Sequence, residues 1–232
     1  MKNAAFLTAG MLCLCALAAG GSAAAQSANS QRAPLDAISK HVGAQGSITE
    51  IAPIFSQLLL TNVPGNFRPA FEHLGNQGTF YIQESVPAGE SDTQWTQMIT
   101  RTGAKGLALR GDITPQMLAA NLAKRFDTAC PTSFSSLDLG EVQLGGAPAY
   151  AMVASCGSVA DGGSLHSEST LILEIKGSND DYSVQWAVRA PASSRPIALD
   201  EAAWRARLQH LQPIRLCPIA PGERAPYPSC AG

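Results

Sequence analysis

The first 25 residues govern how the rest of this chain is read, because they have the three parts of a secretory signal peptide. Lys2 supplies the positive charge, residues 4–18 form an apolar run too short to span a bilayer, and Ala23–Ala25 match the small-x-small pattern of a cleavage site. We therefore predict export with cleavage after Ala25. The remaining chain would begin at Gln26 and fold in an oxidising compartment, either periplasmic or secreted.

Four of the six cysteines remain after this cleavage, since Cys13 and Cys15 belong to the leader. An even number of cysteines in an exported chain favours disulfides over free thiols. Four cysteines allow three pairings, and nearness in the sequence together with the strand layout favours one of them. The pairing that we predict is Cys130–Cys156 and Cys217–Cys230.

Charge and hydropathy restrict the class of protein. The chain has 16 Lys and Arg against 18 Asp and Glu, and Lys2 is the only charged residue of the leader, so the remainder has a net charge of −3. This balance argues against a general nucleic-acid binder. No second apolar run approaches the length of a membrane span, so we expect no transmembrane segment in the mature chain.

Alternating apolar residues and turn signals predict several strands. Residues 55–60 are apolar and short enough to be a strand or a buried helix, and 62–67 read as a turn. Clearer strands are predicted for residues 79–86, 139–144, 147–155, 167–176 and 182–189. Gly145-Gly146 between two of them is a hairpin signal, and connections this short require antiparallel neighbours.

Three helices are predicted from caps and from apolar spacing. Ser91 and Gln94 have the spacing of a capping box, and an amphipathic helix would follow with Trp95, Met98 and Ile99 on one face. Two further helices would begin after Thr114 and after Asp200 as N-caps. The tail after Leu216 shows no periodicity.

These elements predict an α+β fold, an antiparallel β-sheet with helices packed against it. Residues 26–50 are polar and small, and are predicted to be a flexible N-terminal segment. No linker interrupts the chain after that point, so we predict that residues 51–232 form a single domain with a disulfide-closed C-terminal tail.

Several short motifs resemble a family of exported proteobacterial proteins without known activity. They are residues 81–90, 95–100, 129–131 (Ala-Cys-Pro), 155–157 (Ser-Cys-Gly), 167–168 and 185–189 (Gln-Trp-Ala-x-Arg). The strand, the Pro-Gly turn and the tryptophan segment also look like the Mog1/PsbP-like architecture. That resemblance implies a binding or assembly factor more than an enzyme, and it supplies no catalytic residue.

Motifs for catalysis, metals and cofactors are absent from the sequence. His166-x-Glu168 lacks the P-C-x-x-C of a zinc deaminase, no HExxH or G-x-S-x-G occurs, and no Walker lysine follows the glycine-rich turns. We therefore predict no catalytic residue, no metal site and no cofactor.

A group of polar residues lies in the segments where the strand pattern is clearest, and this group is the candidate polar site. Its members are Glu84, Glu90, Glu168, Gln185 and Arg189. An inward carboxylate needs a partner, because burying it unpaired costs several kcal/mol. One interpretation is an ion pair of Arg189 with Glu84 or Glu168, and the other is a ligand-facing pocket.

From these observations we expect an exported, non-catalytic binding or assembly-type protein of the bacterial envelope. Its partner would be an envelope protein or a small ligand, and not nucleic acid. The alternative is a hydrolase or metal-dependent enzyme with His166, Glu168 or Glu84 in its site.

Overall fold

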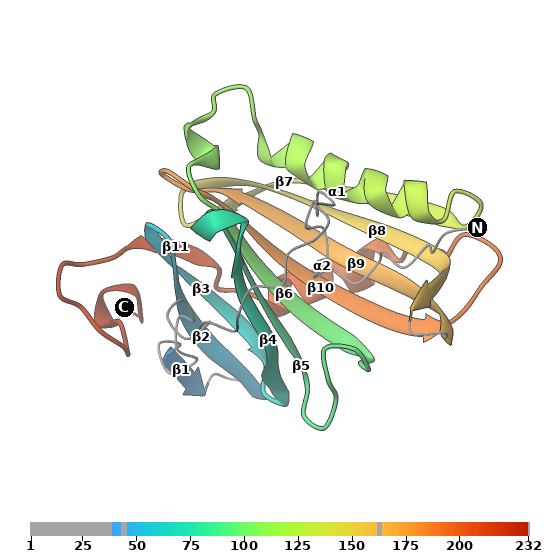
Figure 1. The fold of residues 1–232 in the computed structure, drawn as a ribbon, viewed down its shortest axis with the longest axis horizontal. Coiled ribbons are helices and arrows are strands. Elements are labelled where there is room, and N and C mark those ends of the chain that lie inside the picture. The colour runs from blue at the N-terminus through green and yellow to red at the C-terminus, as the bar shows by residue number, and fades with distance from the viewer. Residues whose placement is uncertain (1–38, 43–45, 162–163, 232) are drawn as a thin grey trace, which may run out of the picture.

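The computed structural model describes residues 39–42, 46–161 and 164–231; the predicted leader and its cleavage site lie outside them. These residues form two antiparallel sheets with helices packed on them (Figure 1). One sheet has the strand order β4-β5-β6-β10-β9-β8-β7, and the other has the order β1-β2-β3-β11. The predicted α+β fold with an antiparallel sheet is thereby confirmed.

The seven-stranded sheet is built from hairpins. Its strands are β4 (Phe67–Gly75), β5 (Phe80–Pro87), β6 (Gln97–Ala104), β7 (Phe134–Leu144), β8 (Ala147–Asp161), β9 (Ser164–Lys176) and β10 (Asp181–Pro191). Gly145 and Gly146 both have positive φ and join β7 to β8, as the hairpin signal predicts. The central pairing of β6 with β10 joins segments that lie far apart in the sequence.

The four-stranded sheet comes from both ends of the described chain. Its strands are β1 (Ser39–Val42), β2 (Ser47–Ile54), β3 (Gln57–Pro64) and β11 (Arg215–Pro218). Residues 47–50, which fall in the segment predicted to be flexible, are therefore part of a strand. The segment 55–60, left open between strand and helix, lies mostly in strand β3, and only Gly65 and Asn66 separate β3 from β4.

Within the described ranges, three α-helices and the two 3-10 turns η3 and η4 accompany the sheets. They are α1 (Pro115–Ala129), α2 (Glu201–His210), α3 (Pro228–Ala231), η3 (Asn76–Gly78) and η4 (Leu107–Leu109). The first two begin as predicted. The Thr114 hydroxyl accepts a hydrogen bond from Met117 N, and the Asp200 carboxylate accepts from the amides of Ala202 and Ala203.

The main core fills the space between the two sheets. Ile54 and Leu59 from the smaller sheet and Leu171 and Val184 from the larger sheet are almost fully buried in it, together with Trp204 of α2. The inward-facing side chains of both sheets pack against each other in this core. The opposite face of the larger sheet is left for α1, which lies over β7, β8 and β9 (Figure 1).

Two disulfides fix peripheral elements to this core. Cys130–Cys156 joins the end of α1 to β8, with a Cα–Cα distance of 5.7 Å, and Cys217–Cys230 joins β11 to α3, at 5.6 Å. Both predicted pairings are confirmed. The second disulfide holds Tyr227 and Cys230 against Leu58 and Leu60 on the outer face of β3.

The helix predicted after Ser91 is wrong, because residues 97–104 form strand β6. Ser91 does accept a hydrogen bond from Gln94 N, but it does so in a turn. Met98 and Ile99 are both buried since β6 is a central strand with both of its faces covered: Met98 packs with Trp95, and Ile99 lies in the core between the sheets. Apolar residues at i, i+3 and i+4 fit such a strand as well as a helix.

Candidate ligand-binding face

One face of the seven-stranded sheet, on the side of α1, is unusually polar. Strand registers place alternate residues of β5, β6, β9 and β10 there. We call this surface the polar face. Its polar members are Glu84, Thr100, Thr102, His166, Glu168, Thr170, Glu174, Asp181, Ser183, Gln185 and Arg189.

Four of the five predicted site residues lie on this face. Glu84 and Gln185 are both opposite Thr100, so these three side chains form one row across β5, β6 and β10. Arg189 lies opposite Glu168 at the end of the adjacent pair of strands. The sequence pattern thus brings Glu84, Glu168, Gln185 and Arg189 to one surface.

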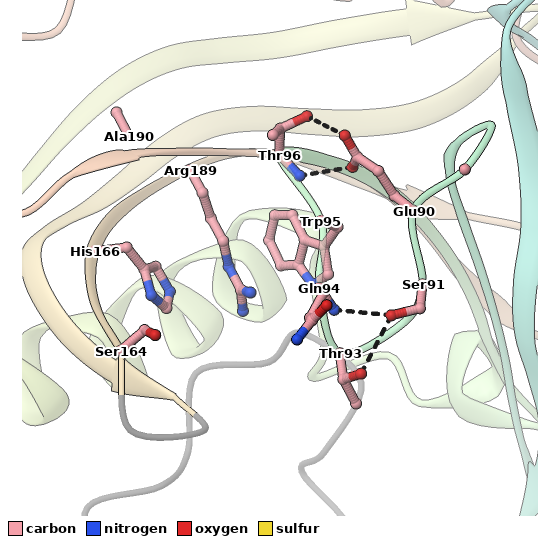
Figure 2. Close-up of a pocket in the computed structure, with 11 residues that line it drawn as sticks. Glu90, Ser91, Thr93, Gln94, Trp95, Thr96, Ser164, His166, Arg189 and Ala190 are labelled. Atoms are coloured by element: carbon pink, nitrogen blue, oxygen red, sulfur yellow. Dashed lines mark hydrogen bonds between the residues drawn. The ribbon is translucent and has the colours of Figure 1, made fainter.

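The fifth, Glu90, lies outside the face, in the loop between β5 and β6. Its carboxylate accepts hydrogen bonds from the amide and the hydroxyl of Thr96, both at 2.7 Å (Figure 2). These contacts hold the loop closed just before β6 begins. Glu90 therefore shapes the border of the polar face.

Several buried polar atoms of the face lack a hydrogen-bond partner among the described residues. Burying such an atom unpaired costs about 1–3 kcal/mol, so a native fold retains several of them only for a reason. The opposite face of β5 and β6 also has such atoms, on Gln83, Ser85 and Arg101. On the polar face they are His166 Nε2 and six oxygens. The oxygens are Glu84 Oε1, Thr100 Oγ1, Glu168 Oε1, Thr170 Oγ1, Asp181 Oδ2 and Gln185 Oε1.

At the Asp181 end of the face, a groove of about 310 Å³ runs between α1 and strands β5, β6 and β10. We call it the α1 groove. Its polar side is made by Glu174, Asp181, Ser183 and Gln185. Its volume is at the lower end of the range for small-molecule sites. The apolar side consists of Phe80, Ile82, Leu107, Leu118 and Leu122.

Burial raises the pKa of the carboxyl groups on the face. Desolvation is the largest cause for each of them, and it raises the pKa of Glu84 to about 7, that of Glu174 to about 8 and that of Asp181 to about 6. Neighbouring negative charge adds to this, from Asp92 and Glu168 at Glu84 and from Asp181 at Glu174. The face is therefore a place where negative charge is unfavourable until a positive group compensates it.

At the Arg189 end, a wider and more open groove of about 900 Å³ lies between the loop 89–96 and β9 (Figure 2). We call it the Arg189 groove. Figure 2 shows Arg189 extended between His166 and Trp95. The guanidinium carbon is 3.6 Å from the centre of the Trp95 ring, a cation–π contact.

Arg189 also forms an ion pair with Glu168, with 3.4 Å between Nε and Oε2. This is one of the two pairs that the sequence predicts. The Glu168 side chain is fully buried and that of Arg189 is only 11% exposed. Desolvation nevertheless dominates at Glu168 and raises its pKa, with His166 and Arg189 acting in the opposite direction.

His166 shares this end of the face with Glu168, as the i, i+2 spacing on a strand predicts. Its Nε2 is 3.8 Å from Glu168 Oε2, which is longer than a hydrogen bond. Across the described ranges, no three His, Cys, Asp or Glu side chains are grouped as a metal ion would require. In that same part of the chain, no helix has the length and apolar character needed to cross a membrane.

Sequence reasoning missed Glu174 and Asp181, although both are part of the α1 groove. The signal was present: Glu174 is in register with Ser183, so a carboxylate and a hydroxyl share the face that Gln185 occupies. Asp181 was read as part of the loop before β10, whereas it begins that strand. Recognising either residue required the register between β9 and β10, which no local pattern supplies.

Comparison with known proteins leaves the chain without a family: no protein-family model and no curated protein match it. Two solved structures are similar at low identity. One is a protein from Bacteroides thetaiotaomicron (13% identity, TM-score 0.35), with 71% of this chain and 46% of that chain covered. The other is LpqN of Mycobacterium tuberculosis, described as involved in cell envelope biogenesis (14% identity, TM-score 0.35, 70% and 85% covered).

The present chain thus spans about half the length of the first of these structures. Both likenesses are too weak to carry an argument about fold or function. The resemblance to exported proteobacterial proteins and to Mog1/PsbP-like domains stays a prediction.

Proposed function

We propose that this chain is an exported, non-catalytic binding protein that holds a small ligand on the polar face. Export rests on the leader sequence and on the two disulfides, which persist in oxidising compartments. The binding role rests on one observation above all: Asp181 Oδ2 and Gln185 Oε1, two buried oxygens unpaired within the described chain, belong to residues that line the α1 groove. A ligand with hydrogen-bond donors would satisfy them.

The enzyme alternative receives less support from the same residues. A base needs a partner within hydrogen-bond distance to orient it, and His166 is 3.8 Å from Glu168. Glu168 instead contacts Arg189, which itself stacks on Trp95. The contacts of Arg189 with Glu168 and Trp95 fix these side chains in place, as expected for residues that line a binding site.

Export is tested by the N-terminus of the protein purified from its native host. Mass spectrometry should find Gln26, or its cyclised form, as the first residue. Intact Met1 on the protein recovered outside the cytoplasm would contradict cleavage after Ala25.

Binding is tested by native mass spectrometry of residues 26–232 mixed with small molecules extracted from the envelope of the host. Wild type should gain a non-covalent mass that is lost under denaturing conditions. Thr102→Trp, which fills the α1 groove, should lose it. Thr128→Trp, at an exposed position of α1, is the matched control and should keep it. An adduct that persists in Thr102→Trp, or no adduct on any form, would contradict a ligand in this groove.

A further inference from the structure

The α1 groove presents hydrogen-bond acceptors on its polar side. Asp181 Oδ2 and Gln185 Oε1 are buried, lack a partner among the described residues, and belong to side chains only 4% and 5% exposed. Gln185, which lines the groove, uses its Nε2 to donate to Ser183 Oγ, so its carbonyl oxygen remains available as an acceptor. A molecule that fits these atoms must supply N–H or O–H donors.

Charge selects among such donors. Two carboxyl groups, Glu174 and Asp181, line the groove, and both are more than nine-tenths buried. The nearby cation on β9, Lys176, donates its Nζ hydrogens to the carbonyls of Arg110 and Ile113. Arg125 of α1 also lines the groove, but its side chain is exposed to solvent. A positively charged donor would therefore form stronger hydrogen bonds with Glu174 and Asp181 than a neutral donor would.

The apolar residues that line the groove determine what the rest of the bound molecule must be. Ile82 is buried, while Phe80, Leu107, Leu118 and Leu122 are partly buried and leave apolar surface towards the groove. A hydrated metal ion would gain nothing from these residues, whereas a hydrocarbon chain or ring would be removed from water against them. Phe80 and Ile82 lie beside the acceptors on the same sheet, and Leu118 and Leu122 come from α1, so the groove of about 310 Å³ has both acceptors and apolar surface.

We propose that the α1 groove binds an organic ammonium compound, with its N–H donors on Asp181, Glu174 and Gln185 and its apolar part against Phe80, Ile82 and the helix α1. This inference rests on the proposed binding function and specifies the ligand class of the same site. The raised pKa of both carboxyls agrees with it, since a bound cation would favour their ionised form.

Isothermal titration calorimetry of the mature protein with three matched probes tests the ligand class. The probes are n-hexylamine, 1-hexanol and hexanoate, in phosphate buffer at pH 8, where the amine is charged. Hexylamine should bind at least tenfold more tightly than hexanol, and hexanoate most weakly. Equal affinity for hexylamine and hexanol, tighter binding of hexanoate, or no binding of hexylamine would overturn the inference.

Variants locate the binding. Asp181→Asn and Glu174→Gln keep the shape of the groove and should each weaken hexylamine at least tenfold. Glu141→Gln, which removes an exposed carboxylate from β7, should leave its affinity unchanged. Leu122→Trp narrows the groove without touching a carboxyl and should also abolish binding. Equal weakening by Glu141→Gln, or unchanged affinity in all three groove variants, would place the amine elsewhere.

Calcium chloride serves as a further probe, in a buffer free of phosphate and of amines because phosphate would precipitate the calcium. If calcium binds and displaces hexylamine, the carboxyls form a metal site and the ammonium proposal fails. The proposed function has its own readout in the native mass spectra. An extract adduct that Thr102→Trp removes, combined with no preference for hexylamine, would retain a binding protein and reject only this ligand class.

Discussion

Glu84, Glu174 and Asp181 make the polar face sensitive to pH. In the folded protein their pKa values are raised to about 7, about 8 and about 6, mainly by desolvation. The folded state therefore binds more protons than the unfolded state between about pH 4 and pH 8, and the free energy of unfolding falls as pH rises through this window. Asp180, whose pKa is lowered by its bonds to Ser56 and Gly106 in spite of desolvation, acts in the opposite direction at lower pH.

We predict that the protein without ligand unfolds at a lower temperature at pH 8 than at pH 5, and that Glu174→Gln reduces this difference. One pKa unit corresponds to about 1.4 kcal/mol. A change of about 1 kcal/mol moves the Tm of a chain of this size by about 2–4 °C. Glu174→Gln should thus raise the Tm at pH 8 by at least about 3 °C.

Thermal unfolding at both pH values measures this difference, with Glu141→Gln as the control. A lower Tm for Glu174→Gln at pH 8 would show that the ionised carboxylate stabilises the fold.

Arg189 is a second residue whose effect should depend on pH. Its removal by Arg189→Ala leaves the fully buried Glu168 without its cation and exposes the Trp95 ring. We expect a loss of about 2–4 kcal/mol at pH 8. The loss should be smaller at pH 5, where Glu168 can take up a proton. Urea denaturation of Arg189→Ala and of Glu168→Gln at both pH values tests this; a loss below about 1 kcal/mol would match an exposed pair instead.

Elements with caps and turns of their own were predictable from the sequence. Thr114-Pro115, Asp200 and Gly145-Gly146 specify α1, α2 and the β7–β8 hairpin through local chemistry. The edge strand β4 was not predicted, because Pro69 interrupts its pattern, and an edge is where a sheet tolerates proline. The pattern of β6 resembles that of a helix because both of its faces are buried, one against Trp95 and the other in the core between the sheets, and this tertiary packing leaves no local signal.

The helix α1 forms one wall of the α1 groove, and Cys130–Cys156 fixes its end to β8. The disulfide joins positions 26 residues apart, and closing a loop of that size contributes about 3 kcal/mol in the chain-entropy model. We therefore expect the double variant Cys130→Ala/Cys156→Ala to lower the free energy of unfolding by about that amount. Denaturant titration gives the value, and non-reducing peptide mapping of wild type gives the pairing. Four free thiols or crossed pairs in the map would contradict the observed arrangement.

At the scale of the molecule, the two sheets meet through the main core and through one buried ion pair. Glu50 of β2 bonds to Arg101 of β6, and their side chains are 2% and 1% exposed. The sequence could not reveal this contact, because Glu50 was assigned to a flexible segment and Arg101 to the end of a helix. The packing of one sheet on the other depends on pairings between distant segments, which no local pattern specifies.

We predict that the mature protein unfolds in a single transition, since separating the sheets would expose both the main core and this ion pair. Arg101→Ala should cost about 3–5 kcal/mol, because it removes the β6 cation that bonds to the buried Glu50 carboxylate. The double variant Glu50→Leu/Arg101→Met removes both charges and should recover most of that loss. Scanning calorimetry of the three forms tests both points together. Two separate transitions in wild type would show that the sheets fold independently. A double variant as unstable as Arg101→Ala would show that the packing around Arg101, and not its charge, joins the sheets.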